Sequence, residues 1–136
     1  MSDDYQIRGL VTGLTPAEKT FLVTHPHLVN TIKANADIAL AEAARRYGGL
    51  HNGRGDAFRH CYWSALLARD IGGDNAAKFT GAHEQWSGNP PGEKAMDLHN
   101  NAVGIAIGRG SPGASNAALA TRCVKAMSSG RLQTMP

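Results

Sequence analysis

Three short polar clusters interrupt sequence that otherwise shows apolar residues at helical spacing. Their ionisable and amide members are Asp56, Arg59 and His60, then His83 and Glu84, then Asp97, Asn100 and Asn101. Burying such groups without partners costs free energy, so their presence on helices that should supply core needs a reason. We expect the three clusters to meet in one functional site.

The first cluster places Asp56, His60 and Ser64 four residues apart, on one face of a helix. This spacing makes His60 a candidate general base or metal ligand, oriented by Asp56. The alternative is that Asp56 only caps the helix and happens to neighbour His60. Arg59 precedes Trp63 by four residues, which favours a cation–π contact at the surface over a clamp for an anionic substrate.

The second cluster, His83–Glu84, begins like the pattern of zinc metalloproteases, which need a second histidine four residues after the first. Ser87 stands at that position, so the comparison fails. Adjacent helical residues diverge by about 100°, so one of the pair should line the site while the other orients it. A purely structural pair is the alternative.

The third cluster forms a polar stripe of Glu93, Asp97, Asn100, Asn101 and Gly104 along one helix. Asp and Asn are poor helix formers, so their use here suggests hydrogen bonding to something specific. Asp97 is expected to approach His60 with either Glu84 or His83. Asn100 and Asn101 would position a substrate.

Other chemistry-bearing residues give weaker signals. No nucleophile elbow or glycine-rich phosphate loop is present, and Cys61 follows His60 too directly to be activated by it. We expect Cys61 and Cys123 to be buried free thiols instead of a disulfide. The remaining histidines are interpreted as non-catalytic: His25, His27, His51 and His99.

The composition predicts one all-α domain. The chain has 136 residues, of which 42% are apolar and 18% charged, enough for a compact core. No period-two strand pattern persists, so we expect five or six helices in a single domain over 15–136, after an irregular arm over 1–14. The Thr15–Glu18 capping box marks the first helix start.

The expected helices run over about 15–25, 26–47, 56–71, 74–86, 91–107 and 115–127. Asp56 and Asp74 are the predicted N-caps of the third and fourth. A flexible loop is expected over 50–55, and the Pro and Gly residues of 87–92 predict a turn or lid-like loop.

Charge and hydropathy limit the partners. The net charge of +3 is spread over scattered Lys and Arg, so nucleic acid is not an expected partner. A weak preference for anionic surfaces remains open. No apolar stretch is long enough for a membrane span, and no signal peptide is recognisable at the start. We expect the chain to be cytoplasmic in the producing cell, with any export independent of a cleaved signal.

Residues 52–105 resemble a family of uncharacterised bacterial helical domains. The shared pattern is Asp-Ala-Phe-Arg-His-x-Tyr-Trp, then Ala-His-Glu, then Met-Asp-Leu-x-Asn-Asn-x-Val-Gly, found here at 56–63, 82–84 and 96–104. Such domains resemble the C-terminal segments of secreted or polymorphic-toxin-like proteins. The resemblance implies a small helical effector or envelope-associated enzyme, with a cognate immunity-type protein as a partner. It supplies no reaction.

These observations lead to one functional hypothesis and its rival. The first is a toxin-like hydrolase of cell-envelope phospholipid or peptidoglycan, with Asp56, His60, Glu84 and Asp97 catalytic. Substrate contacts would come from Arg59, His83, Asn100 and Asn101.

The rival is a non-enzymatic structural or partner-binding module in which the same groups form a buried polar network. A divalent metal such as Zn²⁺ is considered, but the spacing matches no dedicated ligand motif, which favours a metal-free base.

Overall fold

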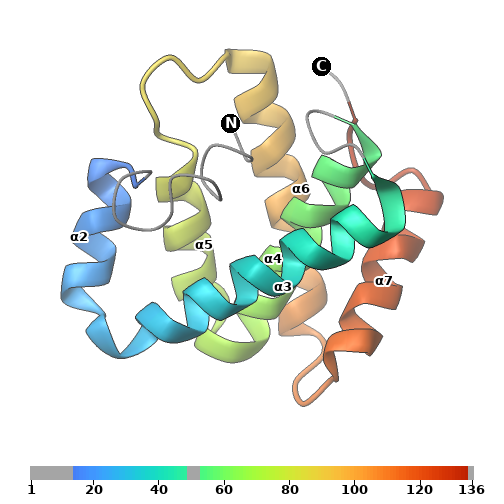
Figure 1. The fold of residues 1–136 in the computed structure, drawn as a ribbon, viewed down its shortest axis with the longest axis horizontal. Helices are drawn as coiled ribbons and strands as arrows, with labels where there is room; N and C mark the ends of the chain where they lie inside the picture. The colour runs from blue at the N-terminus through green and yellow to red at the C-terminus, as the bar shows by residue number, and fades with distance from the viewer. Residues whose placement is uncertain (1–13, 49–52, 135–136) are drawn as a thin grey trace.

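The computed structural model describes residues 14–48 and 53–134. Within these ranges the chain forms six α-helices and one short 3-10 helix, without a strand (Figure 1). The elements are α2 (Pro16–Thr24), η1 (Pro26–Leu28), α3 (Val29–Tyr47), α4 (Arg54–Ile71), α5 (Gly73–His83), α6 (Pro91–Arg109) and α7 (Asn116–Ser128). The predicted all-α fold of five or six helices is confirmed. The predicted N-terminal arm lies outside the described residues, apart from Leu14.

Helix α4 is the centre of the molecule. The helices α3, α5, α6 and α7 all pack against it, and every residue from Gly55 to Ala68 is buried. Phe58 and Leu66 of α4 join Ile32, Phe79 and Leu119 of the surrounding helices in the core, each with no exposed surface. Burying side chains of this size removes most of the apolar surface from water, which stabilises the fold.

The burial of α4 corrects one prediction. Arg59 and Trp63, expected in a surface contact, are each 3% exposed. Four neighbours enclose α4 over Gly55–Ala68, so even the polar residues of this stretch lie in the interior. This is why Asp56, His60 and Ser64 are buried as well.

The predicted N-caps of α4 and α5 are wrong. Helix α4 begins at Arg54 with Gly53 as its N-cap, and α5 begins at Gly73 after Gly72. Asp56 and Asp74 instead lie in the first turns, where a carboxylate interacts favourably with the helix dipole.

Three other boundaries differ from the sequence prediction. Helix α5 ends at His83, three residues before the expected Trp86. A 3-10 turn over Pro26–Leu28 precedes α3, which begins only at Val29. Arg54 and Gly55 belong to α4 and not to a loop, while 50–52 lie outside the described residues.

The first helix begins as predicted, and its cap also ties it to α5. Thr15 Oγ1 accepts from the Glu18 backbone N–H at 3.0 Å, and Glu18 Oε1 accepts from the Thr15 N–H at 2.8 Å. The same hydroxyl donates to the Ala82 carbonyl oxygen at 2.8 Å. Glu18 Oε2 lies 3.0 Å from His83 Nδ1. Helix α2 therefore fixes the end of α5.

Helices α4 and α6 approach until their backbones touch. A Cβ added at Gly104 would lie 2.1 Å from the Cys61 carbonyl oxygen, and one at Gly108 would lie 2.4 Å from that of Ala65. Only glycine fits such an approach. The close crossing brings the polar stripe of α6 directly against His60.

Two further predictions concern thiols and membranes. Cys61 of α4 and Cys123 of α7 are both buried and free, as expected, with their Sγ atoms 3.2 Å apart. Among the helices of the described residues, none combines the length and the apolar character needed to cross a bilayer.

Candidate active site: a buried histidine–carboxylate cluster

The His60 ring is held in one orientation by Asn101. His60 Nδ1 lies 3.1 Å from Asn101 Oδ1, and Ser64 Oγ donates to the same oxygen at 3.2 Å. Because an amide oxygen only accepts hydrogen bonds, Nδ1 carries the imidazole proton. The lone pair of the neutral ring therefore lies on Nε2.

Nε2 faces two carboxylates from two helices. It lies 3.5 Å from Asp56 Oδ1 on α4 and 3.4 Å from Asp97 Oδ1 on α6. One ligand atom from each of the three residues lies within 4.8 Å of the other two. The predicted approach of Asp97 to His60 is therefore present in the structure.

Glu84 completes the group from the end of α5. Its Oε2 lies 3.8 Å from His60 Nδ1, and its Oε1 accepts from Asn89 Nδ2 at 3.3 Å. Asn89 also donates to the Glu84 carbonyl oxygen at 2.8 Å, which closes the turn after α5. We refer to Asp56, His60, Glu84 and Asp97 as the His60 cluster.

Asn101 Nδ2 is a buried polar atom without a hydrogen-bond partner among the described residues, whereas the Glu84 and Asp97 side chains share a hydrogen bond that favours ionised Asp97 and lowers its pKa. All three residues are buried, with at most 3% of their surface exposed. Unpartnered buried polar atoms are rare and cost free energy. Within the cluster, the two carboxyl groups are therefore partners of one another, and Asn101 Nδ2 is the atom left without a partner among the described residues.

Arg59 places a positive charge beside the cluster. Its Nη2 lies 3.4 Å from Asp56 Oδ1, and both side chains are buried. The guanidinium remains charged under all ordinary conditions, so it partly neutralises Asp56. The contact between Arg59 and Asp56 lies inside the protein. The predicted contact of Arg59 with an anionic substrate stays a prediction.

Burial shifts the ionisation of the cluster in opposite directions. Desolvation lowers the pKa of His60 to about 3. Desolvation, followed by the charge of Asp97, raises the pKa of Glu84 to about 9. Desolvation, followed by the charge of Asp56, raises the pKa of Asp97 to about 7. At neutral pH the protein alone therefore holds a neutral imidazole beside a protonated Glu84.

Two predicted site residues have other partners. His83 turns toward α2, where its Nδ1 lies 3.0 Å from Glu18 Oε2, and its ring meets Trp63 edge-on at 5.6 Å. Asn100 donates to the Gln133 carbonyl oxygen at 2.9 Å and accepts from the Gln133 N–H at 2.8 Å. In the adjacent pair His83–Glu84, Glu84 is the residue that faces His60. In the adjacent pair Asn100–Asn101, it is Asn101.

The histidines interpreted as non-catalytic lie away from the cluster. His25 Nδ1 contacts the Phe21 carbonyl oxygen at 2.9 Å, and the exposed His99 Nε2 contacts that of Arg131 at 2.8 Å. His27 lies in the 3-10 turn beside His25, at a ring distance of 6.3 Å. His51 is outside the described residues.

A surface pocket of about 610 Å³ lies against Glu84, which is itself fully buried. Its other lining residues come from the turn after α5 and from α6, and include Trp86, Asn89, Lys94 and Leu98. The sequence indicated a lid-like turn here but did not single out Trp86 or Lys94, because nothing local distinguishes them from ordinary surface residues.

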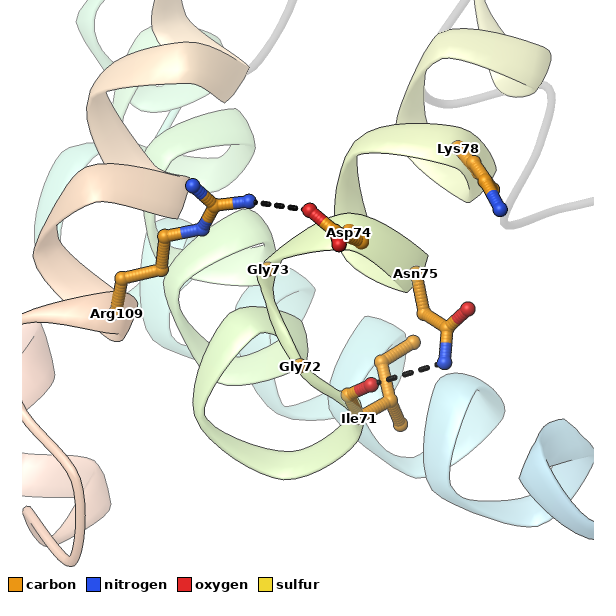
Figure 2. A pocket seen from close by; sticks show the side chains of 7 residues that line it. All are labelled: Ile71, Gly72, Gly73, Asp74, Asn75, Lys78 and Arg109. Carbon is orange, nitrogen blue, oxygen red and sulfur yellow. Dashed lines mark hydrogen bonds and ion pairs between the residues drawn. The ribbon is translucent and has the colours of Figure 1, made fainter.

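A larger pocket of about 690 Å³ lies at the start of α5 (Figure 2). Arg109 and Asp74 form an ion pair of 2.7 Å at its edge, and Lys78 lies further along the helix. No member of the His60 cluster lines it. Volume alone therefore does not identify the site, and the smaller pocket is the one that meets the ionisable groups.

The fold and the site define an all-α domain with a histidine–carboxylate cluster enclosed at its centre. The chain belongs to the family described as "Domain of unknown function (DUF6973)", whose family model matches residues 19–131. The matched range contains the whole His60 cluster. No solved structure matches the chain.

Proposed function

We propose that the chain is a hydrolase that uses the His60 cluster as its reacting centre. The observation that supports this proposal best is the position of His60 Nε2, which faces two carboxylate oxygens at 3.4 and 3.5 Å. A water or hydroxyl group against Nε2 would be positioned to lose its proton. The Asn101 contact with Nδ1 fixes the ring for this task.

Each member of the cluster has a role in this proposal. His60 acts as general base or as a ligand that activates water, and Asp56 and Asp97 stabilise the positive charge that develops there. Glu84 is the second proton-transfer group, because it alone of the four also lines the surface pocket. A substrate would thus enter at the turn that follows α5.

The proposed substrate is cell-envelope material, with phospholipid ahead of peptidoglycan. The envelope assignment rests on the resemblance to toxin-like domains described above. The pocket favours lipid, because Trp86 and Leu98 offer apolar contact while Lys94 offers an ammonium group to an anionic headgroup. Trp86 Nε1 and Asn89 Oδ1 add two polar atoms that lack hydrogen-bond partners among the described residues.

The same resemblance supports the remaining parts of the proposal. A toxin-like effector would be made in the cytoplasm of a bacterial producing cell and exported without a cleaved signal peptide. A cognate immunity-type protein would bind it and block the Glu84 pocket. These statements rest on the resemblance and on no contact within the molecule.

The test is hydrolysis by the purified protein. It is incubated with anionic phospholipid vesicles and, separately, with isolated peptidoglycan, and released fatty acid or sugar is measured. We expect fatty acid release, reduced about 10²–10⁴-fold by His60→Gln because general-base assistance is removed. His99→Gln, a control at an exposed histidine, should retain full activity. Failure to hydrolyse either substrate would contradict the proposal.

A second candidate function is a non-enzymatic module that uses the cluster as a structural network. The shared acceptor Asn101 Oδ1, bonded to both His60 and Ser64, favours it. Stability separates the two. Asp97→Asn should be neutral or stabilising in an active site, which sacrifices stability for function, but should destabilise a structural network by about 1–3 kcal/mol.

A further inference from the structure

We propose that Asp56, His60 and Asp97 bind one first-row divalent metal ion. The ligand atoms are Oδ1 of each aspartate and Nε2 of the histidine, contributed by α4 and α6. The proposal concerns binding alone, so it stands whether or not the chain is a hydrolase. It reverses the preference for a metal-free base that the sequence favoured. The sequence showed only that no known ligand motif was present, whereas the structure gives the distances between the candidate ligand atoms.

The first support is the separation of the ligand atoms. Zinc binds nitrogen and oxygen ligands at about 2.0–2.2 Å, so two ligands of a tetrahedral site lie about 3.4 Å apart. Nε2 lies 3.4 Å from Asp97 Oδ1 and 3.5 Å from Asp56 Oδ1. A cation placed between the three atoms would reach all of them with little movement of the side chains.

The second support is the orientation of the imidazole. A metal-binding histidine commonly donates its other ring N–H to an oxygen, which fixes the tautomer and directs the lone pair. His60 does this through Nδ1 and Asn101 Oδ1. Ser64 donates to the same oxygen and holds the amide in place.

The third support is the negative charge gathered around Nε2. Asp56 and Asp97 are 2% and 3% exposed, so both carboxyl groups are buried. Buried groups of like charge repel one another unless positive charge lies close to them. The guanidinium of Arg59, 3.4 Å from Asp56 Oδ1, and the hydrogen bond between Glu84 and Asp97 offset part of this charge. A metal ion against Nε2 would offset the rest.

The donor set identifies the class of ion. One imidazole with two carboxylates and no thiolate suits Zn²⁺ or Mn²⁺ better than a soft ion such as Cu⁺. An imidazole ligand also argues against Ca²⁺ or Mg²⁺, which prefer oxygen alone. Three protein ligands leave one position for water.

Metal analysis of protein purified without an affinity tag tests the proposal. The protein is stripped with chelator and dialysed against Zn²⁺ or Mn²⁺, the bound ion is counted by mass spectrometry, and affinity is measured by calorimetry. We expect one ion per chain. Asn101→Ala, which only orients His60, should weaken binding about 10–100-fold. Asp97→Asn, which removes a ligand, should weaken it further.

The control is His99→Ala, which removes an exposed histidine and should leave both stoichiometry and affinity unchanged. Circular dichroism shows whether each variant is folded. If a variant does not fold, the number of ions bound by the wild-type protein still tests the proposal. Failure of the wild type to bind either ion stoichiometrically would overturn the proposal, as would equal affinity in folded Asp97→Asn.

This experiment is separable from the test of hydrolysis. Stoichiometric metal without any product would support the metal site and reject the hydrolase. Hydrolysis by a protein that binds neither ion stoichiometrically would support the hydrolase and reject the metal site.

Discussion

Asn101 shows how much of the cluster depends on a single side chain. Its Oδ1 accepts from Ser64 and contacts His60 Nδ1, so it sets the direction of the lone pair opposite Asp56 and Asp97. The adjacent Asn100 instead bonds both backbone groups of Gln133. Sequence reasoning placed both residues at the substrate, because the spacing of a stripe cannot show which member of an adjacent pair faces a neighbouring helix.

The Asp70 carboxylate provides a residue-level test of stability, away from the cluster. It accepts from Arg69 at 2.6 and 2.9 Å and from Asn35 at 3.0 Å. The Arg69 hydrogen bond, ahead of Asn35, lowers the pKa of Asp70 below its ordinary value. We expect Asp70→Asn to reduce the free energy of unfolding at pH 7 by roughly 1 kcal/mol, after allowance for solvent screening.

The pH dependence follows from the lowered pKa. The stabilisation is complete above the unfolded-state pKa, about 4, and is lost as the pH falls through the lower folded-state value. Urea unfolding between pH 3 and 7 should therefore show the two proteins converging in acid. Asp37→Asn, at an exposed position in the middle of α3, should stay close to the wild type throughout. A difference for Asp70→Asn that persists undiminished at pH 3 would contradict the assignment.

At the scale of elements, the crossing of α4 and α6 sets the geometry of the cluster. Gly104 and Gly108 allow the contact by leaving the space that a Cβ would fill. The sequence predicted both helices and placed Gly104 at the end of the polar stripe. It did not predict that α4 is buried all round over Gly55–Ala68, because amphipathic spacing assigns each helix a solvent face by default.

Gly104→Ala tests this crossing. The new Cβ would lie 2.1 Å from the Cys61 carbonyl oxygen, so the helices must separate, and overpacking of this kind costs about 1–3 kcal/mol. Gly81→Ala is the matched control, because a Cβ there meets nothing within 4 Å. That change should stabilise α5 by roughly 0.5–1 kcal/mol. Thermal or urea unfolding measures both, and a neutral Gly104→Ala would contradict the described contact.

At the scale of the whole molecule, the site and the core are the same region. The ring centroid of Trp63 lies 6.0 Å from that of Phe79 and 5.6 Å from that of His83. This core residue therefore packs against α5 beside the cluster. The fold class was predictable because helical spacing and a capping box are local signals. The meeting of Asp56 with Asp97 depends on packing between distant segments, which no local pattern encodes.

Unfolding should therefore be a single cooperative transition. In Trp86→Phe, Trp63 is the remaining tryptophan and reports on the packing between α4 and α5. We expect its fluorescence and the far-UV circular dichroism to change with the same midpoint in urea. Loss of the fluorescence signal at lower urea than the helical signal would show that α5 separates first, contrary to this expectation.

The backbone contact between α4 and α6 also determines which side of the cluster can give way. His60 and Asp97 sit on two helices that cannot move closer and that would leave a void if they moved apart. The distance between His60 and Asp97 is therefore set by the packing of these two helices. Glu84 is attached differently, at a helix end followed by a short turn that Asn89 closes with its side chain. We therefore expect a molecule bound at the cluster to displace Glu84 and to leave the spacing between His60 and the two aspartates unchanged.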